Sequence, residues 1–191
     1  MKYLFPYEEY GSVEIPDRQL SGVYSLNAAD APKDPRHLIA EALERPIGSS
    51  RLKQRVRPGM KTVIVVDDNT RSTRTELMLP SVIAELLSAG IERDNIRVFI
   101  ALGTHRTMTR DEMEDKYTPE LVARYEFVLP NWKNPGEYAA VSSSGGFEIK
   151  IHSQLLKADF IIGIGQTVPH LIAGFGGGCK IINPGCADPG T

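Results

Sequence analysis

The run Lys61-Thr-Val-Ile-Val-Val66 limits the possible folds of this chain more than any other stretch. It is rich in β-branched residues and apolar from Val63 onward, whereas a strand with one face in water alternates apolar and polar residues. An uninterrupted apolar strand is expected where helices cover both faces of a sheet. The run therefore predicts a central strand of an α/β fold.

The residues after this run predict a β-α-β unit. A helix is expected from Thr73 or Thr75 to about Ala89, and Gly90 ends it. Its apolar side is predicted to consist of Leu77, Val82, Leu86 and Leu87. A second strand is predicted at residues 97–102, and a crossover of this kind between parallel strands is right-handed.

A third strand is predicted at residues 158–165, an apolar run flanked by glycines that we expect to be buried. Residues 1–5 and 12–15 are extended candidates for an edge strand or arm, and residues 141–151 predict a hairpin broken at Gly145 and Gly146. The predicted fold class is α/β: a mainly parallel sheet flanked by helices, Rossmann-like and three-layered, with a small hairpin and an extended N-terminal arm.

Three further helices are predicted from their capping residues. An Asp, Ser or Thr before a helix accepts a hydrogen bond from a free N–H of the first turn. The predicted caps are Asp34 for a helix up to Pro46, Ser49 or Ser50 for a short helix at 51–56, and Thr109, in a capping box with Glu112, for a helix up to about Tyr117. Turns are predicted around Pro16 and at residues 27–32.

The composition is that of an ordinary globular protein. The 191 residues are 41% hydrophobic and 24% charged, with a formal net charge of −2. A balanced charge of this size gives no electrostatic footprint for nucleic acid or an anionic membrane surface. The longest apolar runs fall short of the roughly 18 residues of a membrane span. The N-terminus has no signal-peptide pattern, so we expect a cytoplasmic location.

Cys179 and Cys186 are the only two cysteines, and their spacing differs from the C-x₂-C and C-x₄-C patterns of zinc sites. We expect two small thiols, buried or partly buried, in a reducing compartment.

The stretch from Gln166 to Gly185 concentrates glycines around His170 and Lys180. Glycines allow a backbone to approach a ligand closely. The stretch differs from a phosphate-binding P-loop, because Ile181 replaces the hydroxyl residue that holds magnesium. A lysine in a dry pocket also acts as a nucleophile or as a covalent anchor for a cofactor carbonyl. A glycine-rich connector with a surface lysine remains the alternative.

Polar residues follow each of the three predicted strands. They are Asp67, Asp68 and Arg71 after the first strand, His105 and Arg106 after the second, and His170 and Lys180 after the third. Because the carboxyl ends of parallel strands meet at one edge of a sheet, we expect one site there. Two histidines suit reversible proton transfer near neutral pH, and Arg71 or Arg106 suits bidentate binding of a carboxylate.

Three motifs resemble the N-terminal half of the nickel-dependent lactate racemase family. They are Asp67-Asp-Asn-Thr-Arg71, Gly103-Thr-His-Arg106, and Pro169-His170 followed by Gly174-Phe-Gly-Gly-Gly-Cys-Lys180 and Pro184-Gly185. The resemblance implies a nickel pincer cofactor, a pyridinium-3,5-bisthiocarboxylic acid mononucleotide, tethered covalently to Lys180.

The same resemblance implies roles for the other motif residues. His105 and His170 correspond to a catalytic acid–base pair, and Arg71 to a residue that binds the substrate carboxylate. The cofactor-binding set is implied to be Lys180, Asp68, Thr70, Arg71, Gly176, Gly177 and Gly178.

The chain also departs from the family pattern. Ser72 stands where the family usually has proline, and three glycines and Cys179 precede the lysine. The family has a second, C-terminal domain and a nickel-ligating histidine shortly beyond the lysine loop, which we expect beyond Thr191. Residues 1–191 are therefore expected to form a single N-terminal, cofactor-attaching domain, as a truncated chain or a stand-alone domain.

The function implied is that of a lactate racemase-like isomerase, a 2-hydroxyacid racemase or epimerase. It would work by hydride transfer through a 2-keto acid, with the two histidines as acid and base. The expected partners are a small 2-hydroxy acid and the C-terminal domain of the same protein. Two alternatives stay open: an enzyme with pyridoxal phosphate on Lys180, and a non-catalytic domain that binds a nucleotide or a partner.

Overall fold

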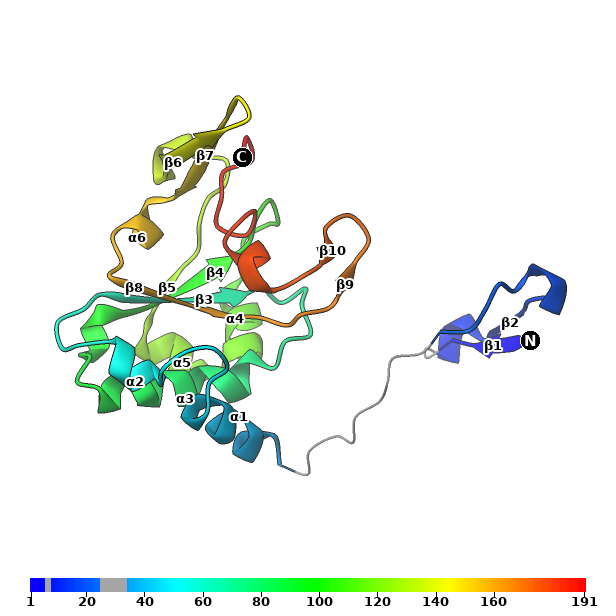
Figure 1. Ribbon diagram of the computed structural model, residues 1–191, viewed down its shortest axis with the longest axis horizontal. Coiled ribbons are helices and arrows are strands. Elements are labelled where there is room, and N and C mark those ends of the chain that lie inside the picture. Colours follow the sequence, from blue (N-terminus) through cyan, green and yellow to red (C-terminus); the bar gives the residue numbers. More distant parts are fainter. Residues whose placement is uncertain (6–7, 25–33) are drawn as a thin grey trace. The chain divides into compact units, whose positions relative to one another are not determined.

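The computed structural model describes residues 1–5, 8–24 and 34–191 and divides the chain into two compact units, Met1–Lys33 and Asp34–Thr191 (Figure 1). In the first unit, β1 (Lys2–Leu4) pairs antiparallel with β2 (Ser12–Glu14). The two predicted extended segments are confirmed, but they pair with one another and not with the main sheet. Two 3₁₀ helices, η1 (Glu8–Tyr10) and η2 (Asp17–Gln19), complete the described part. The turn predicted at 27–32 lies outside the described residues.

The second unit contains a four-stranded parallel sheet, as the sequence predicts. Its strands are β3 (Thr62–Asp67), β4 (Ile96–Ala101), β5 (Glu126–Val128) and β8 (Phe160–Ile164), in the order β5-β4-β3-β8. β3 pairs in parallel with β4 on one side and with β8 on the other. The loops after these three strands therefore leave the same edge of the sheet side by side.

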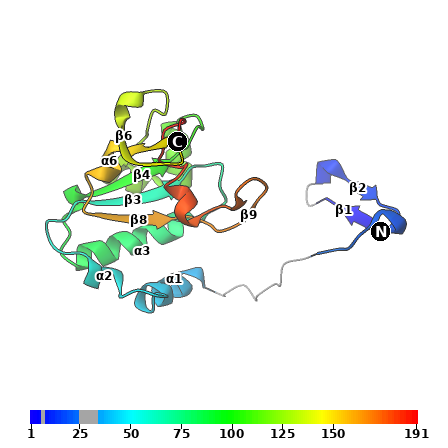
Figure 2. The same cartoon turned by 45° about the horizontal axis from the view of Figure 1, so that its top comes forward.

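Helices flank the sheet. They are α1 (Pro35–Glu44), α2 (Leu52–Arg55), α3 (Thr75–Ser88), α4 (Arg110–Tyr117), α5 (Pro119–Arg124) and α6 (Ser153–Leu156), with 3₁₀ helices η3 (Arg93–Asn95), η4 (Pro135–Glu137) and η5 (Gly178–Ile181). Figure 2 shows α1, α2 and α3 on one face of the sheet and α6 on the other. Two antiparallel pairs complete the unit: β6 (Tyr138–Ser144) with β7 (Phe147–His152), and β9 (Pro169–His170) with β10 (Gly174–Phe175).

The side chains of β3 supply the core on both faces of the sheet. Ile64 and Val66 are fully buried in the cluster that includes Leu79 and Leu86 of α3. Val63 and Val65 belong to the opposite cluster, which includes Leu155 of α6 as well as Cys186 and Ala187 from the end of the chain. Successive side chains of a strand point to opposite faces, so an unbroken apolar run is what two covered faces require.

Two of the predicted caps are confirmed and one is wrong. Asp34 accepts a hydrogen bond from the Arg36 N–H at 2.9 Å, and Thr109 and Glu112 form the predicted capping box. The short helix α2 begins after Arg51, not after Ser49 or Ser50. The N–H of this N-cap residue, Arg51, donates to the side chain of Gln54 at 3.1 Å, which is the reciprocal bond of a capping box.

Two predictions of burial are also wrong. Leu87 is 41% exposed, because it lies about 100° around α3 from the buried Leu86 and beyond the covered stripe. The strand predicted to be buried, β8, is an edge strand that pairs only with β3, and Ile161 is 41% exposed. Within the described residues, no helix is both long enough and apolar enough to cross a lipid bilayer.

Leu86 and Leu87 provide a matched test of this packing. Leu86→Ala should lower the free energy of unfolding by about 2–5 kcal/mol, because it leaves a cavity under the sheet. Leu87→Ala, the same change one residue later, should cost less than about 1 kcal/mol. Urea unfolding of both variants measures the difference. Equal losses would contradict the described position of α3.

Candidate functional site

The loops after β3, β4 and β8 enclose a cavity of about 280 Å³, which we call the loop cavity. Its ionisable lining residues are Asp67, Asp68, Arg71, His105, His170 and Lys180. The residues that follow the three strands therefore line one cavity, as the sequence predicts. Of the other residues predicted for the site, Gly176 and Gly177 line the cavity, whereas Thr70, Arg106 and Gly178 do not.

His105 is oriented by a buried carboxylate. Its Nδ1 lies 2.6 Å from Oδ2 of Asp68, which is only 2% exposed. The other oxygen of Asp68 accepts from the Thr70 N–H at 3.1 Å and from the Thr70 hydroxyl at 2.6 Å. An ionised carboxylate only accepts hydrogen bonds, so the proton of the neutral imidazole sits on Nδ1. Nε2 of His105 then carries a lone pair.

His170 differs from His105 because its Nδ1 faces hydrogen-bond donors and not an acceptor. Its Nδ1 accepts hydrogen bonds from the N–H groups of Ile172 at 3.2 Å and Ala173 at 3.1 Å, within its own loop. A nitrogen that accepts two N–H groups carries a lone pair, so the proton of the neutral ring sits on Nε2. These contacts predict different neutral tautomers for the two imidazoles of the cavity, with a lone pair on Nε2 of His105 and an N–H on Nε2 of His170.

Two cationic side chains of the cavity lack a direct polar partner. Within residues 34–191, neither the Arg71 guanidinium nor the Lys180 ammonium makes a hydrogen bond or an ion pair, although the charge of Arg71 acts to lower the pKa of Asp67. Arg106 instead pairs with Glu112 through its two terminal guanidinium nitrogens, Nη1 and Nη2, and these bonds lower the pKa of the Glu112 carboxyl to about 2. Of the two arginines considered, Arg71 is therefore the one available for a ligand carboxylate.

Asp67 forms part of the cavity wall and lacks one partner. Its Oδ2 accepts from the Thr73 hydroxyl, whereas its Oδ1 is buried and has no hydrogen-bond partner. Burial raises the pKa of this carboxyl, and the bond from Thr73 opposes the shift. The Asp67 carbonyl accepts from the buried Tyr117 hydroxyl at 2.7 Å. A buried oxygen without a partner is a place where a ligand donor adds binding energy.

Close backbone contacts determine the conformation of the segment from Gly176 to Lys180. Gly177 has φ 75°, and a Cβ there would lie 2.5 Å from the Gln166 carbonyl oxygen, so only glycine fits. Lys180 follows in η5, where its N–H donates to the Gly177 carbonyl at 3.1 Å. Ile181 and Ile182 pack against the core cluster of Val63 and Val65. The backbone of Lys180 is thus fixed while its amine remains free.

The other histidines and the cysteines lie outside this chemistry. His37 is exposed on α1, and His152 is a buried, hydrogen-bonded imidazole. Cys186 is buried, which raises its thiol pKa, but Cys179 is exposed, contrary to expectation. Cys179 lies in η5, in which no residue is buried. Among the described residues, no group of three or more His, Cys, Asp or Glu side chains is arranged to hold a metal ion.

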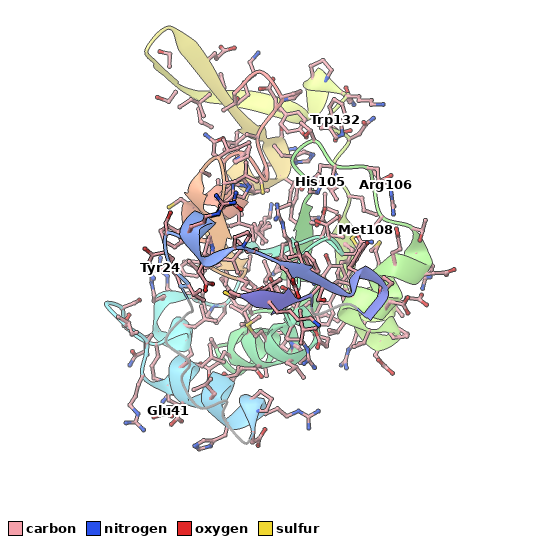
Figure 3. All side chains as sticks on the ribbon, turned by 90° about the vertical axis from the view of Figure 1, so that its right-hand side faces the viewer. Tyr24, Glu41, His105, Arg106, Met108 and Trp132 are labelled. Carbon is pink, nitrogen blue, oxygen red and sulfur yellow. The ribbon has the colours of Figure 1, made fainter. Side chains whose placement is uncertain are left out.

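Two residues near the site were not singled out from the sequence. Gln166 lines the cavity, and its side-chain oxygen accepts from the Ser72 hydroxyl at 2.8 Å. The indole N–H of Trp132, in the loop after β5, donates to the main-chain carbonyl of His105 at 3.0 Å. The sequence feature that could have indicated Trp132 is that it is the one tryptophan of the chain and stands in an otherwise polar loop. Figure 3 labels His105 and Trp132, which lie close together.

Comparisons with known proteins point to one family. Residues 7–191 match the family described as the lactate racemase N-terminal domain. Lactate racemase of Thermoanaerobacterium thermosaccharolyticum is 30% identical over 183 residues, which are 91% of this chain and 41% of that protein. Lactate racemase of Lactiplantibacillus plantarum is 30% identical over 151 residues, 78% of this chain and 35% of that protein. The chain therefore spans about two fifths of these curated relatives.

Solved structures agree. The lactate racemase apoprotein of T. thermosaccharolyticum superposes with a TM-score of 0.78 at 29% identity, over 93% of this chain and 41% of that one. A Thermotoga maritima protein solved by a structural genomics consortium gives a TM-score of 0.62 at 28% identity, over 80% of this chain and 37% of that one.

The tautomers can be read directly by nitrogen NMR of the ¹⁵N-histidine-labelled chain, at a pH where the rings are neutral. We expect His105 to carry its proton on Nδ1, because it faces Asp68, and His170 to carry it on Nε2. His152, whose Nδ1 accepts from the Gln154 N–H at 3.2 Å, is the internal reference for the Nε2–H form. Single His→Gln variants assign the signals. Finding the same tautomer at both residues would overturn this description.

Proposed function

We propose, on the premise that this chain belongs to the lactate racemase N-terminal domain family, that it is the cofactor-attaching domain of a nickel-pincer-dependent 2-hydroxyacid racemase or epimerase. The observation that carries the proposal is the loop cavity, which gathers a free lysine, a free arginine and two histidines from three strand ends. The proposed activity belongs to the complete protein, because the relatives are more than twice as long as the matched part.

The residues of the loop cavity fit the proposed cofactor. A covalent tether needs an amine that is accessible and held in place, and Lys180 has no competing partner among the described residues. Gly176 and Gly177 leave the adjoining wall without side chains. Because the described residues offer no metal-binding cluster, we propose that the cofactor brings the nickel, with a further ligand from a histidine beyond Thr191. When bound, the cofactor supplies an acceptor for the α-hydride of the substrate.

The chain's own residues then bind and deprotonate a 2-hydroxy acid. Arg71 binds the carboxylate, which both enantiomers share, through two parallel hydrogen bonds. The lone pair of His105 Nε2 accepts the hydroxyl proton. The ring becomes an imidazolium at that moment, and the ionised Asp68 at 2.6 Å stabilises the positive charge. Asp68 thus acts on the reaction through His105.

His170 takes part from the other flank, since its loop follows β8 whereas that of His105 follows β4. With Nδ1 accepting from its own turn, its Nε2–H is available to donate a hydrogen bond to a hydroxyl or carbonyl oxygen of the substrate. To act as a base it needs its proton on Nδ1, which requires release of the Ile172 and Ala173 N–H groups. We propose that the turn at 170–173 opens and closes as His170 changes role.

Both histidines should be required in both directions. His105→Ala and His170→Ala in the complete enzyme should each lower kcat by about 10²–10⁴ from either enantiomer, the usual contribution of a positioned acid or base. His37→Ala, an exposed histidine on α1, is the matched control and should leave kcat unchanged. The rate is followed by chiral analysis from each pure enantiomer. A variant that racemises as fast as the parent would remove that histidine from the mechanism.

The covalent link is tested by intact mass. Expressed with nickel and the enzymes that build the cofactor, the complete protein should gain the mass of the pincer mononucleotide, and peptide fragmentation should place it on Lys180. Lys180→Arg keeps the charge but removes the amine, so it should stay at the apoprotein mass and be inactive. Lys157→Arg, at the exposed end of α6, is the control and should load normally.

The alternative covalent chemistry gives a different result in the same experiment. A pyridoxal phosphate adduct that borohydride fixes on Lys180 would support the Schiff-base enzyme. An adduct on Lys157 would exclude the proposed role of Lys180.

A further inference from the structure

The segment after β5, residues 129–137, is linked to the loop that carries His105 by the side chain of Trp132. Trp132 donates its indole N–H to the main-chain carbonyl of His105 at 3.0 Å. The Lys133 ammonium lies 5.3 Å from the centre of the indole ring, a weak cation–π contact at an exposed position. His105 is therefore contacted from both neighbouring loops, on its ring by Asp68 and on its backbone by Trp132.

The turn that carries Trp132 is organised around one carboxylate. Glu137 accepts from the Asn131 N–H at 3.0 Å and from the Asn134 side chain at 3.1 Å. Its Oε2 lies 3.2 Å from Nε2 of His152. These donors lower the pKa of Glu137, with the Asn131 N–H as the largest cause. The turn is thus closed on both sides of Trp132 by hydrogen bonds to an ionised group.

The same turn is anchored to the strand that carries His105. His152 is 5% exposed, and its ring packs edge to face against that of Phe99, with the two ring centres 4.9 Å apart. Phe99 is a fully buried residue of β4, and His105 lies four residues beyond the end of this strand. The Trp132 turn and His105 therefore share one rigid base, so the indole can fix the backbone of His105 relative to the sheet.

We propose that Trp132 is a positioning residue for His105, which rests on the proposed role of His105 as the base. The Asp68 contact orients the imidazole but does not touch the main chain of His105. In the loop after β4, the His105 N–H donates to the Leu102 carbonyl and the Gly103 N–H to the Gly185 carbonyl, both at 2.9 Å. The Trp132 indole adds a restraint on the carbonyl side of His105. Because general-base catalysis depends on placing the nitrogen within hydrogen-bond reach of its proton, a shift of the backbone lowers turnover without weakening substrate binding.

The first test uses the chain itself and needs no cofactor. Trp132 is the only tryptophan of this chain, so a tryptophan auxotroph can replace it by benzothienylalanine, in which sulfur replaces the N–H, or by 5-fluorotryptophan, which keeps the N–H. We expect the main-chain ¹³C signal of the His105 carbonyl to move in the benzothienylalanine protein and to stay in the fluorotryptophan protein. If the His105 carbonyl carbon has the same chemical shift in both proteins, the hydrogen bond from Trp132 is wrong.

The second test separates kcat from KM in the complete, loaded enzyme. Trp132→Phe keeps an aromatic ring but loses the donor, and should lower kcat by roughly 10- to 100-fold with KM changed less than about twofold. Lys133→Ala, which leaves the indole in place, is the matched control and should keep kcat within about threefold of the parent. Urea unfolding must show equal stability for both variants. An unchanged kcat in Trp132→Phe, or an equal loss in Lys133→Ala, would overturn the proposal.

The two tests keep this proposal separate from the proposed function. If the complete parent enzyme fails to racemise any 2-hydroxy acid, the proposed function fails, while the ¹³C test still decides whether Trp132 fixes the His105 backbone. If the parent racemises and Trp132→Phe does so equally well, only the role of Trp132 fails.

Discussion

The position of β3 between two parallel partners is the constraint on which the rest of the molecule depends. Ile64, Val65 and Val66 are fully buried, and their strand makes hydrogen bonds to β4 and to β8. Because both edges and both faces of β3 are occupied, its carboxyl end is enclosed by the two neighbouring loops. Of the two residues at this end, Asp68 is thereby buried and Asp67 partly buried.

Burial of these carboxylates determines the chemistry of the site. Removing a charge from water costs several kcal/mol unless donors replace the lost hydration. Asp68 receives three donors, two from Thr70 and one from His105. Asp67 receives a donor on one oxygen only, and burial raises its pKa. The two adjacent aspartates thus differ in the number of donors that they bind, and of the two it is Asp68 that contacts an imidazole.

The two histidines of the cavity differ in how firmly they are held. His105 is contacted by side chains from two neighbouring loops, Asp68 on the ring and Trp132 on the backbone. His170 is held by N–H groups of its own turn, where Leu171 is 96% and Ile172 84% exposed. A segment with few buried contacts opens at low free energy. This difference suits one fixed base and one group that changes its role.

The sequence by itself determined the strands β3, β4 and β8, the approximate bounds of α1, α3 and α4, and the polar residues that follow the three strands. These depend on local patterns: the β-branched run of β3, the capping Asp34, and polar residues directly after apolar ones. Only the tertiary structure decided the order β5-β4-β3-β8, the exposure of Leu87 and Ile161, and the pairing of Arg106 with Glu112, which leaves Arg71 for a ligand. It also decided the tautomers and brought Trp132 to His105 across 27 residues of sequence. The physical reason is that hydrogen bonds and burial between distant segments depend on which strands become neighbours, and no local spacing records that choice.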